Sequence, residues 1–227
     1  LNGNNRIMDK LHRLTVAIAV ILIALAASSC AILRAGSHVS DVFMREGDPE
    51  LAKAALPTMM KAAEALYLAD QGNPAKALTV GQLYVMYANA FIDAEAFLLP
   101  DEAFVERQAL TIRANALYLR AAGVLVPAVE AKAKGAFDPD DAVASKALAR
   151  LGRKDVPLLY WTAAAVMAAF ASDPMNFDNA GRVANAIALF ERALVLDPDW
   201  NGGGLHELAI TIYGSLPAEL GGDKDKA

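Results

Sequence analysis

Apolar residues recur at helical spacing along most of this chain, and turn residues divide it into segments of helix length. Proline beside aspartate or asparagine marks several segment starts, because an Asp or Asn side chain caps a helix and proline tolerates the first turn. The expected helices cover residues 49–71, 74–99, 101–134, 139–152, 155–172, 180–196 and 204–216, with a kink near Pro127. Short links between such helices predict antiparallel neighbours.

A spacing of small and large residues repeats in three of these helices. It places alanine, a large residue and alanine at Ala62/Leu66/Ala69, Ala114/Tyr118/Ala121 and Ala186/Phe190/Ala193. A proline follows each triplet, as in the second helix of a tetratricopeptide repeat, where alanines allow close approach and the large residue fills the groove. Matching first helices contain Tyr84/Tyr87/Ala88/Phe91 and Trp161/Ala164/Ala165/Ala168. The predicted fold is all-α, an antiparallel stack of helix hairpins built from degenerate tetratricopeptide-like repeats (an α-solenoid).

The N-terminus has the layout of a secretory signal. A basic stretch at residues 6–13 precedes the uncharged apolar residues 14–27, and small residues lead into Cys30, the only cysteine. This placement resembles the lipobox of bacterial lipoproteins, in which lipid is attached to the thiol before cleavage. We expect a lipoprotein signal peptide (1–29), a lipidated tether (30–47) and a helical repeat domain (48–227), with the protein lipid-anchored in the periplasm. An uncleaved anchor helix from Leu14 to Leu33 and a plain secreted protein are the alternatives.

Composition and charge favour one fold class and argue against one class of partner. Hydrophobic residues make up 56% of the chain and aromatic residues 7%, which favours closely packed helices over sheet. Residues 1–29 hold three of the 21 basic and one of the 26 acidic residues, which leaves 18 against 25 and a net charge of −7. An acidic body without a basic cluster argues against nucleic acid as a partner. With one cysteine, no intrachain disulfide can form.

The motifs that carry chemistry are incomplete. His206-Glu207 begins like the H-E-x-x-H zinc motif, but the second ligand position is Ile210. The glycine run 202–204 has no preceding strand and no following Gly-Lys-Ser/Thr, which favours a flexible helix-start turn over a phosphate cradle. No G-x-S-x-G elbow occurs, and Asp140 with Asp141 suits a helix start. We therefore expect no enzyme activity, no metal and no cofactor.

Aromatic residues with a polar atom are the best candidates for a binding site. Such side chains commonly fill a core while their polar atom reaches a partner, so each one alone indicates packing more than binding. As a group they suit an apolar hollow with few polar contacts. The predicted ligand-binding residues are Tyr160, Trp161, Trp200, His206 and Tyr213.

Three stretches resemble the T-component (TatT) lipoproteins of TRAP-type (tripartite ATP-independent periplasmic) transporters. They are residues 82–91 (QLYVMYANAF), 155–162 (DVPLLYWT) and 197–207 (DPDWNGGGLHE), the last continuing to YGSLP at 213–217. The resemblance implies a periplasmic helical repeat lipoprotein that forms a homotrimer, encloses an apolar hollow and works with a periplasmic solute-binding protein. It also implies a further helix after residue 227, so that the chain would be a fragment; an ordinary chain end is the alternative.

The leading hypothesis is a non-enzymatic accessory protein of solute uptake, which docks a substrate-binding protein and holds an apolar or amphiphilic organic ligand. A structural repeat scaffold of an envelope complex, with no small ligand, is the alternative. An envelope hydrolase is the least supported, because no catalytic site is assembled in the sequence.

Overall fold

The computed structural model describes residue 42 and residues 45–227. The signal peptide 1–29, the lipid site Cys30 and nearly all of the tether 30–47 lie outside the described residues. Residues 47–227 form one compact unit. Within the described residues this unit is built from helices joined by turns, as the all-α prediction requires.

The predicted helices are all present, with small shifts at their ends. They are α2 (Pro49–Leu68), α3 (Pro74–Tyr87), the π-helix η1 (Ala88–Asp93), α4 (Ala94–Leu98), α5 (Phe104–Lys132), α6 (Asp141–Leu148), α7 (Val156–Ser172), α8 (Phe177–Ala180), α9 (Val183–Leu196) and α10 (Gly204–Ser215). Short 3-10 turns add η2 (Arg153–Asp155), η3 (Trp200–Gly203) and η4 (Ala218–Leu220). The expected helix 74–99 is the continuous run α3–η1–α4, and α5 continues through Pro127.

Side-chain caps explain where several helices begin. The Asp48 carboxylate accepts the backbone N–H of Glu50 at 3.0 Å, and the Asn73 amide oxygen accepts that of Ala75 at 3.1 Å. Proline follows each of these two caps at the first helical position. The helix expected from residue 139 begins later, at Asp141, because Asp140 is the residue that caps it.

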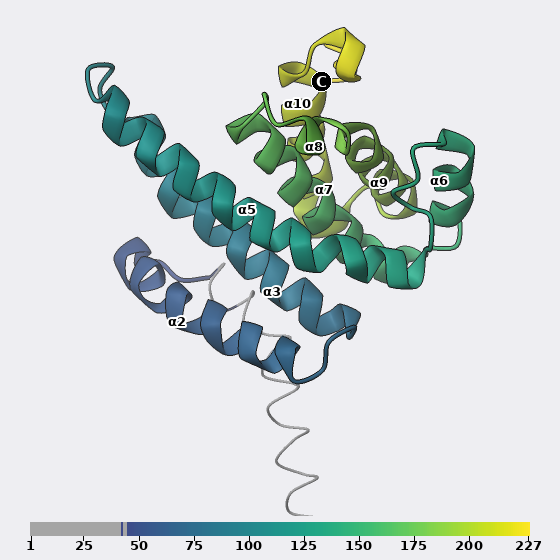
Figure 1. The fold of residues 1–227 in the computed structure, drawn as a ribbon, viewed down its shortest axis with the longest axis horizontal. Coiled ribbons are helices and arrows are strands. Elements are labelled where there is room, and N and C mark those ends of the chain that lie inside the picture. The colour runs from purple at the N-terminus through teal and green to yellow at the C-terminus, as the bar shows by residue number, and fades with distance from the viewer. Residues whose placement is uncertain (1–41, 43–44) are drawn as a thin grey trace, which may run out of the picture. The chain divides into compact units, whose positions relative to one another are not determined.

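Each long helix packs against the next. The run α3–η1–α4 and α5 form a long antiparallel hairpin, and α2 lies along α3 (Figure 1). The helix α7 packs on both α3 and α5, α9 packs on α7, and α10 contacts α9 and α7. The largest fully buried side chains come from all of these layers: Leu56, Tyr84, Ile92, Tyr118, Leu125, Leu159, Leu189, Phe190, Leu205 and Ile212.

Two of the three alanine triplets occupy helix contacts, and the third does not. Ala114/Tyr118/Ala121 in α5 and Ala186/Phe190/Ala193 in α9 are fully buried. Ala62 in α2 and Ala69, the residue that follows α2, are exposed, and Leu66 is 51% exposed, so the assignment of this triplet to a helix contact was wrong. The helix α2 instead buries Ala52, Leu56 and Met60, and Ala62 lies about 200° around the helix from Met60. The solenoid of repeats remains a prediction.

An ion pair between half-exposed Lys132 and buried Asp155 joins the end of α5 to the start of α7. The Lys132 ammonium donates to Asp155 at 2.5 Å, and the other carboxylate oxygen of Asp155 accepts the Gly152 N–H at 3.0 Å. Burial by itself would raise the pKa of Asp155, but Lys132 and the Gly152 N–H outweigh it and lower that pKa. The predicted helix start at Asp155 is therefore fixed by a carboxylate whose ionised form these contacts favour.

The helices α3 and α5 approach each other closely at Gly81. A Cβ atom added to Gly81 would lie 2.3–2.7 Å from three side-chain carbons of Leu125. Leu125 is fully buried, so its side chain has little room to move away. Glycine at position 81 therefore sets the distance between these two helices.

We predict that Gly81→Ala lowers the free energy of unfolding by about 1–2 kcal/mol. Overpacking costs about 1–3 kcal/mol, of which the better helix propensity of alanine returns about 0.5–1 kcal/mol. Gly123→Ala is the matched control, because a Cβ at Gly123 meets no atom within 4 Å, and it should raise stability slightly. Chemical denaturation of both variants measures the difference; equal effects would contradict the close contact.

Candidate functional site

Three of the predicted site residues come together where α7 begins and η3 lies. The Tyr160 ring lies 5.1 Å from the Trp161 ring, edge to face at 88°. It also lies 4.7 Å from the Trp200 ring at 49°. All three side chains are partly buried. We call Tyr160, Trp161 and Trp200 the aromatic cluster; it brings α7 together with a turn about 40 residues further along the sequence.

A left-handed turn holds Trp200 in this cluster. Asn201, Gly202 and Gly203 have φ angles of 53°, 65° and 103°, and α10 begins at the next residue. Glycine adopts these angles at little cost, and asparagine tolerates the first of them better than most residues do. A Cβ at Gly202 or Gly203 would meet no atom within 4 Å. Glycine is therefore favoured here because of the backbone conformation, since a side chain would have room. The glycine run forms the predicted turn at a helix start, here in the left-handed conformation; its flexibility stays a prediction.

Glu207, in the first turn of α10, lies close enough to the aromatic cluster to act on Tyr160 through its charge. Burial and the negative charge of Glu207 raise the pKa of Tyr160. His206, the fourth predicted site residue, is exposed on the same turn. Among residues 42 and 45–227, no three His, Cys, Asp or Glu side chains gather as a metal site.

Tyr213, the fifth predicted residue, is buried in a different group of side chains. Its ring lies 5.8 Å from that of Phe190 at 71°, and its hydroxyl donates to Glu191 at 2.9 Å. Burial, together with Glu191 and Asp223, raises the pKa of Tyr213 to about 12. The ammonium of Lys226 lies 5.4 Å from the ring centre. Tyr213 thus anchors α10 to α9.

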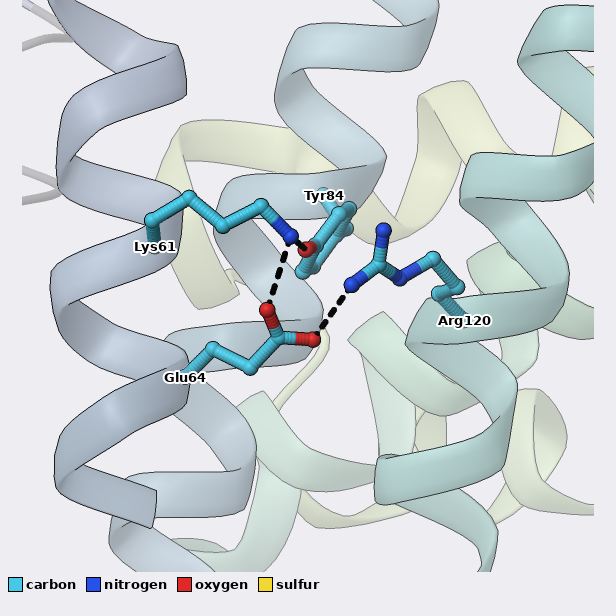
Figure 2. A network of polar contacts seen from close by, with 4 residues as sticks. All are labelled: Lys61, Glu64, Tyr84 and Arg120. Carbon is cyan, nitrogen blue, oxygen red and sulfur yellow. Dashed lines mark hydrogen bonds and ion pairs between the residues drawn. The ribbon is translucent and has the colours of Figure 1, made fainter. Parts of the chain in front are cut away.

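A polar network connects α2, α3 and α5 (Figure 2). It was not predicted from the sequence. Glu64 accepts Lys61 at 2.8 Å and Arg120 at 2.6 Å. Lys61 also donates to the Tyr84 hydroxyl at 3.0 Å, and the Arg120 guanidinium lies 4.9 Å from the Tyr84 ring centre. The hydrogen bond from Lys61 lowers the pKa of Glu64, and Arg120 lowers it further; together they outweigh burial, which would raise it. The Lys61/Glu64 spacing of three was the available signal, because residues three apart share a helix face.

A second polar contact connects the π-helix to α5. The Tyr118 hydroxyl donates to Asp93 at 2.5 Å. Burial raises the pKa of both groups, and the charge of Asp93 raises that of Tyr118 further. A π-helix adds a residue to a turn and changes which side chains face inward, and here Asp93 is the last residue of η1. The contact therefore holds the hairpin together.

Comparison with known proteins gives a family match. The family model described as TRAP transporter T-component matches residues 45–227. A Treponema pallidum (strain Nichols) protein described as uncharacterized is 34% identical over an alignment of 200 residues, and the alignment covers 84% of this chain. The chain spans 62% of that relative's length.

We predict that Gly203→Ala costs about 1–2 kcal/mol, the usual penalty for an L side chain in the left-handed region. The substitution should also loosen Trp200 from Tyr160. Both tryptophans of the chain lie in the cluster, so their fluorescence reports on it directly. Gly202→Asn is the control, because asparagine tolerates a φ of 65°; it should leave melting and emission nearly unchanged. If Gly203→Ala leaves both the stability and the tryptophan fluorescence unchanged, the turn does not position Trp200.

Proposed function

Because the chain belongs to the TRAP transporter T-component family, we propose that it docks the periplasmic substrate-binding protein of a TRAP-type solute uptake system. The match over residues 45–227 supports an accessory role in transport at the cell envelope. Docking is proposed as a non-enzymatic function, with no cofactor. The number of subunits is proposed to be three, from the family resemblance.

The aromatic cluster is the proposed ligand site. Its three rings are partly buried and meet at a junction of α7 and η3, which is the observation that carries this proposal. Partly buried aromatic side chains offer apolar area together with an indole N–H or a phenol O–H. An apolar or amphiphilic organic molecule suits them, since its burial contributes roughly 25 cal/mol per Å² of apolar surface. We also propose His206 and Tyr213, which both lie in α10, as ligand-binding residues.

The proposed anchor is lipid on Cys30, which would follow the signal peptide 1–29 and hold the domain through the tether 30–47. The family match supports an envelope location for the domain. A lipid-anchored periplasmic domain would work close to the transporter in the membrane.

We predict that Trp200→Ala and Tyr160→Phe weaken fatty-acid binding while the melting temperature moves little. For Trp200→Ala the expected loss is about tenfold or more, because about 1.4 kcal/mol of lost contact corresponds to tenfold. Tyr118→Phe is the matched control: Tyr118 is buried and bonded to Asp93, so its loss should lower melting and leave binding unchanged. Titration and melting are measured on the same preparations.

Binding losses that follow stability in every variant would place the cluster in the core and leave the ligand site elsewhere. A wild-type protein that binds no fatty acid and co-purifies with no organic molecule, as measured by native mass spectrometry, would favour the scaffold hypothesis.

We predict that Cys30→Ser abolishes labelling by a radioactive fatty acid and moves the protein out of the membrane fraction. The reason is that the thiol is the proposed site of lipid attachment and the signal peptide is then removed. A variant that stays in the membrane at its unprocessed mass would instead support the uncleaved anchor from Leu14 to Leu33.

A further inference from the structure

The turn between α4 and α5 carries four large apolar side chains that are exposed to solvent. Phe97 and Leu98 are the last two residues of α4 and are 87% and 80% exposed. Phe104 and Val105 are the first two residues of α5 and are 64% and 77% exposed. We call residues 97–106 the hairpin tip. Single exposed apolar side chains are ordinary, whereas a group of them on one feature marks a binding surface.

The hairpin tip extends beyond the helix that packs along the rest of α5. The helix α7 starts beside Lys132 and ends at Ser172. There Asn115 of α5 donates to the carbonyl of Ala169 at 2.9 Å and to the hydroxyl oxygen of Ser172 at 3.0 Å. The first part of α5, residues 104–114, continues past this point for about 16 Å at 1.5 Å per residue. The main contacts of α4 are with α5 and η1, and Figure 1 shows the turn clear of the other helices.

Hydrogen bonds from one side chain hold the hairpin tip in a defined shape. The Arg107 guanidinium donates to the carbonyl of Leu99 at 2.8 Å and to that of Pro100 at 3.0 Å. It also lies 3.4 Å from the Asp101 carboxylate. These bonds satisfy backbone carbonyls at the end of α4, which the helix itself leaves without partners. A surface that already has its bound shape loses less conformational entropy when a partner covers it.

The charge of the hairpin tip favours one class of partner. Its carboxylates are Asp101, Glu102 and Glu106, and it contains no Lys or Arg. All three are exposed, and neither Glu102 nor Glu106 pairs with a cation of residues 45–227. A membrane of anionic lipids repels such a surface, and so does a second copy of it. Exposed phenylalanines beside carboxylates instead fit an apolar pocket on another protein, with Lys and Arg at its rim.

We propose that the hairpin tip is the surface with which this protein docks the substrate-binding protein. Phe97, Leu98 and Phe104 enter an apolar pocket of the partner, and Lys or Arg side chains at its rim face Glu102 and Glu106. This inference rests on the proposed docking function and adds to it the surface and the chemistry of the partner's pocket. The aromatic cluster lies where α7 begins, whereas the hairpin tip lies past the end of α7. A partner at the tip therefore leaves the proposed ligand site uncovered.

The test is binding of the full chain, in detergent, to the immobilised substrate-binding protein of the same transport system, measured by surface plasmon resonance. We expect Phe97→Ala and Phe104→Ala each to raise the dissociation constant about tenfold or more, because a few buried anchors carry most of the binding energy of an interface. Phe177→Ala is the matched control, since Phe177 is 86% exposed but lies in α8; it should bind like the wild type. All three variants should melt like the wild type, because the side chains removed are exposed.

A second pair of variants tests the charges. Glu102→Gln should slow association and reduce its dependence on salt, because charges at the rim of an interface act mainly on the association rate. Glu219→Gln removes an exposed carboxylate from η4 and should leave both the rate and its salt dependence unchanged.

The results that would overturn the inference also separate it from the docking function. Wild-type affinity in both Phe97→Ala and Phe104→Ala would retain docking and place it on another surface. A wild-type protein that does not bind the substrate-binding protein would overturn docking together with its surface. If the tip variants change the mass measured by light scattering, the tip makes subunit contacts; if they bind phosphatidylglycerol vesicles less tightly than the wild type, it contacts lipid. Either result would overturn the inference.

Discussion

The close approach of α3 and α5 at Gly81 is the constraint on which the rest of the domain depends. Leu125 occupies the space that a side chain at position 81 would need, so the two helices pack at short distance at this point. Two features follow from this contact. The hairpin presents a joint surface to α7, and it turns the opposite side of α5 outward. The Tyr118–Asp93 bond then secures the hairpin further along.

The two halves of the domain carry different kinds of surface. In the N-terminal half, Glu64 of α2 accepts hydrogen bonds from Lys61 and from Arg120 of α5, and the Arg120 guanidinium lies over the ring of Tyr84. Several apolar side chains of α5 are exposed on its outer face. In the C-terminal half, the left-handed turn at residues 201–203 returns the chain so that Trp200 contacts Tyr160. The proposed ligand site in the C-terminal half is therefore separate from the exposed apolar face of α5.

The polar groups inside the domain stabilise contacts between helices. Asp155 fixes the start of α7 through Lys132, and Tyr213 connects α10 to α9 through Glu191. Each group is satisfied by a partner from a different helix, as buried polar groups require. Such pairs make each helix depend on its neighbour, since breaking one leaves a polar group without its partner in a poorly solvated place.

The sequence by itself determined the helices and most of their ends, because caps and turn residues act over a few positions: Asp48, Asn73 and Asp155 each lie where a helix begins. It also marked the family, through stretches that include Tyr160 and Trp200. Only the tertiary structure decided which apolar face is covered. Ala62/Leu66/Ala69 has the same spacing as Ala114/Tyr118/Ala121, yet one triplet is exposed and the other buried. Spacing defines a face, whereas burial depends on a neighbouring helix that is distant in sequence. For the same reason Tyr213 lies with Phe190, apart from the aromatic cluster that the sequence grouped it with.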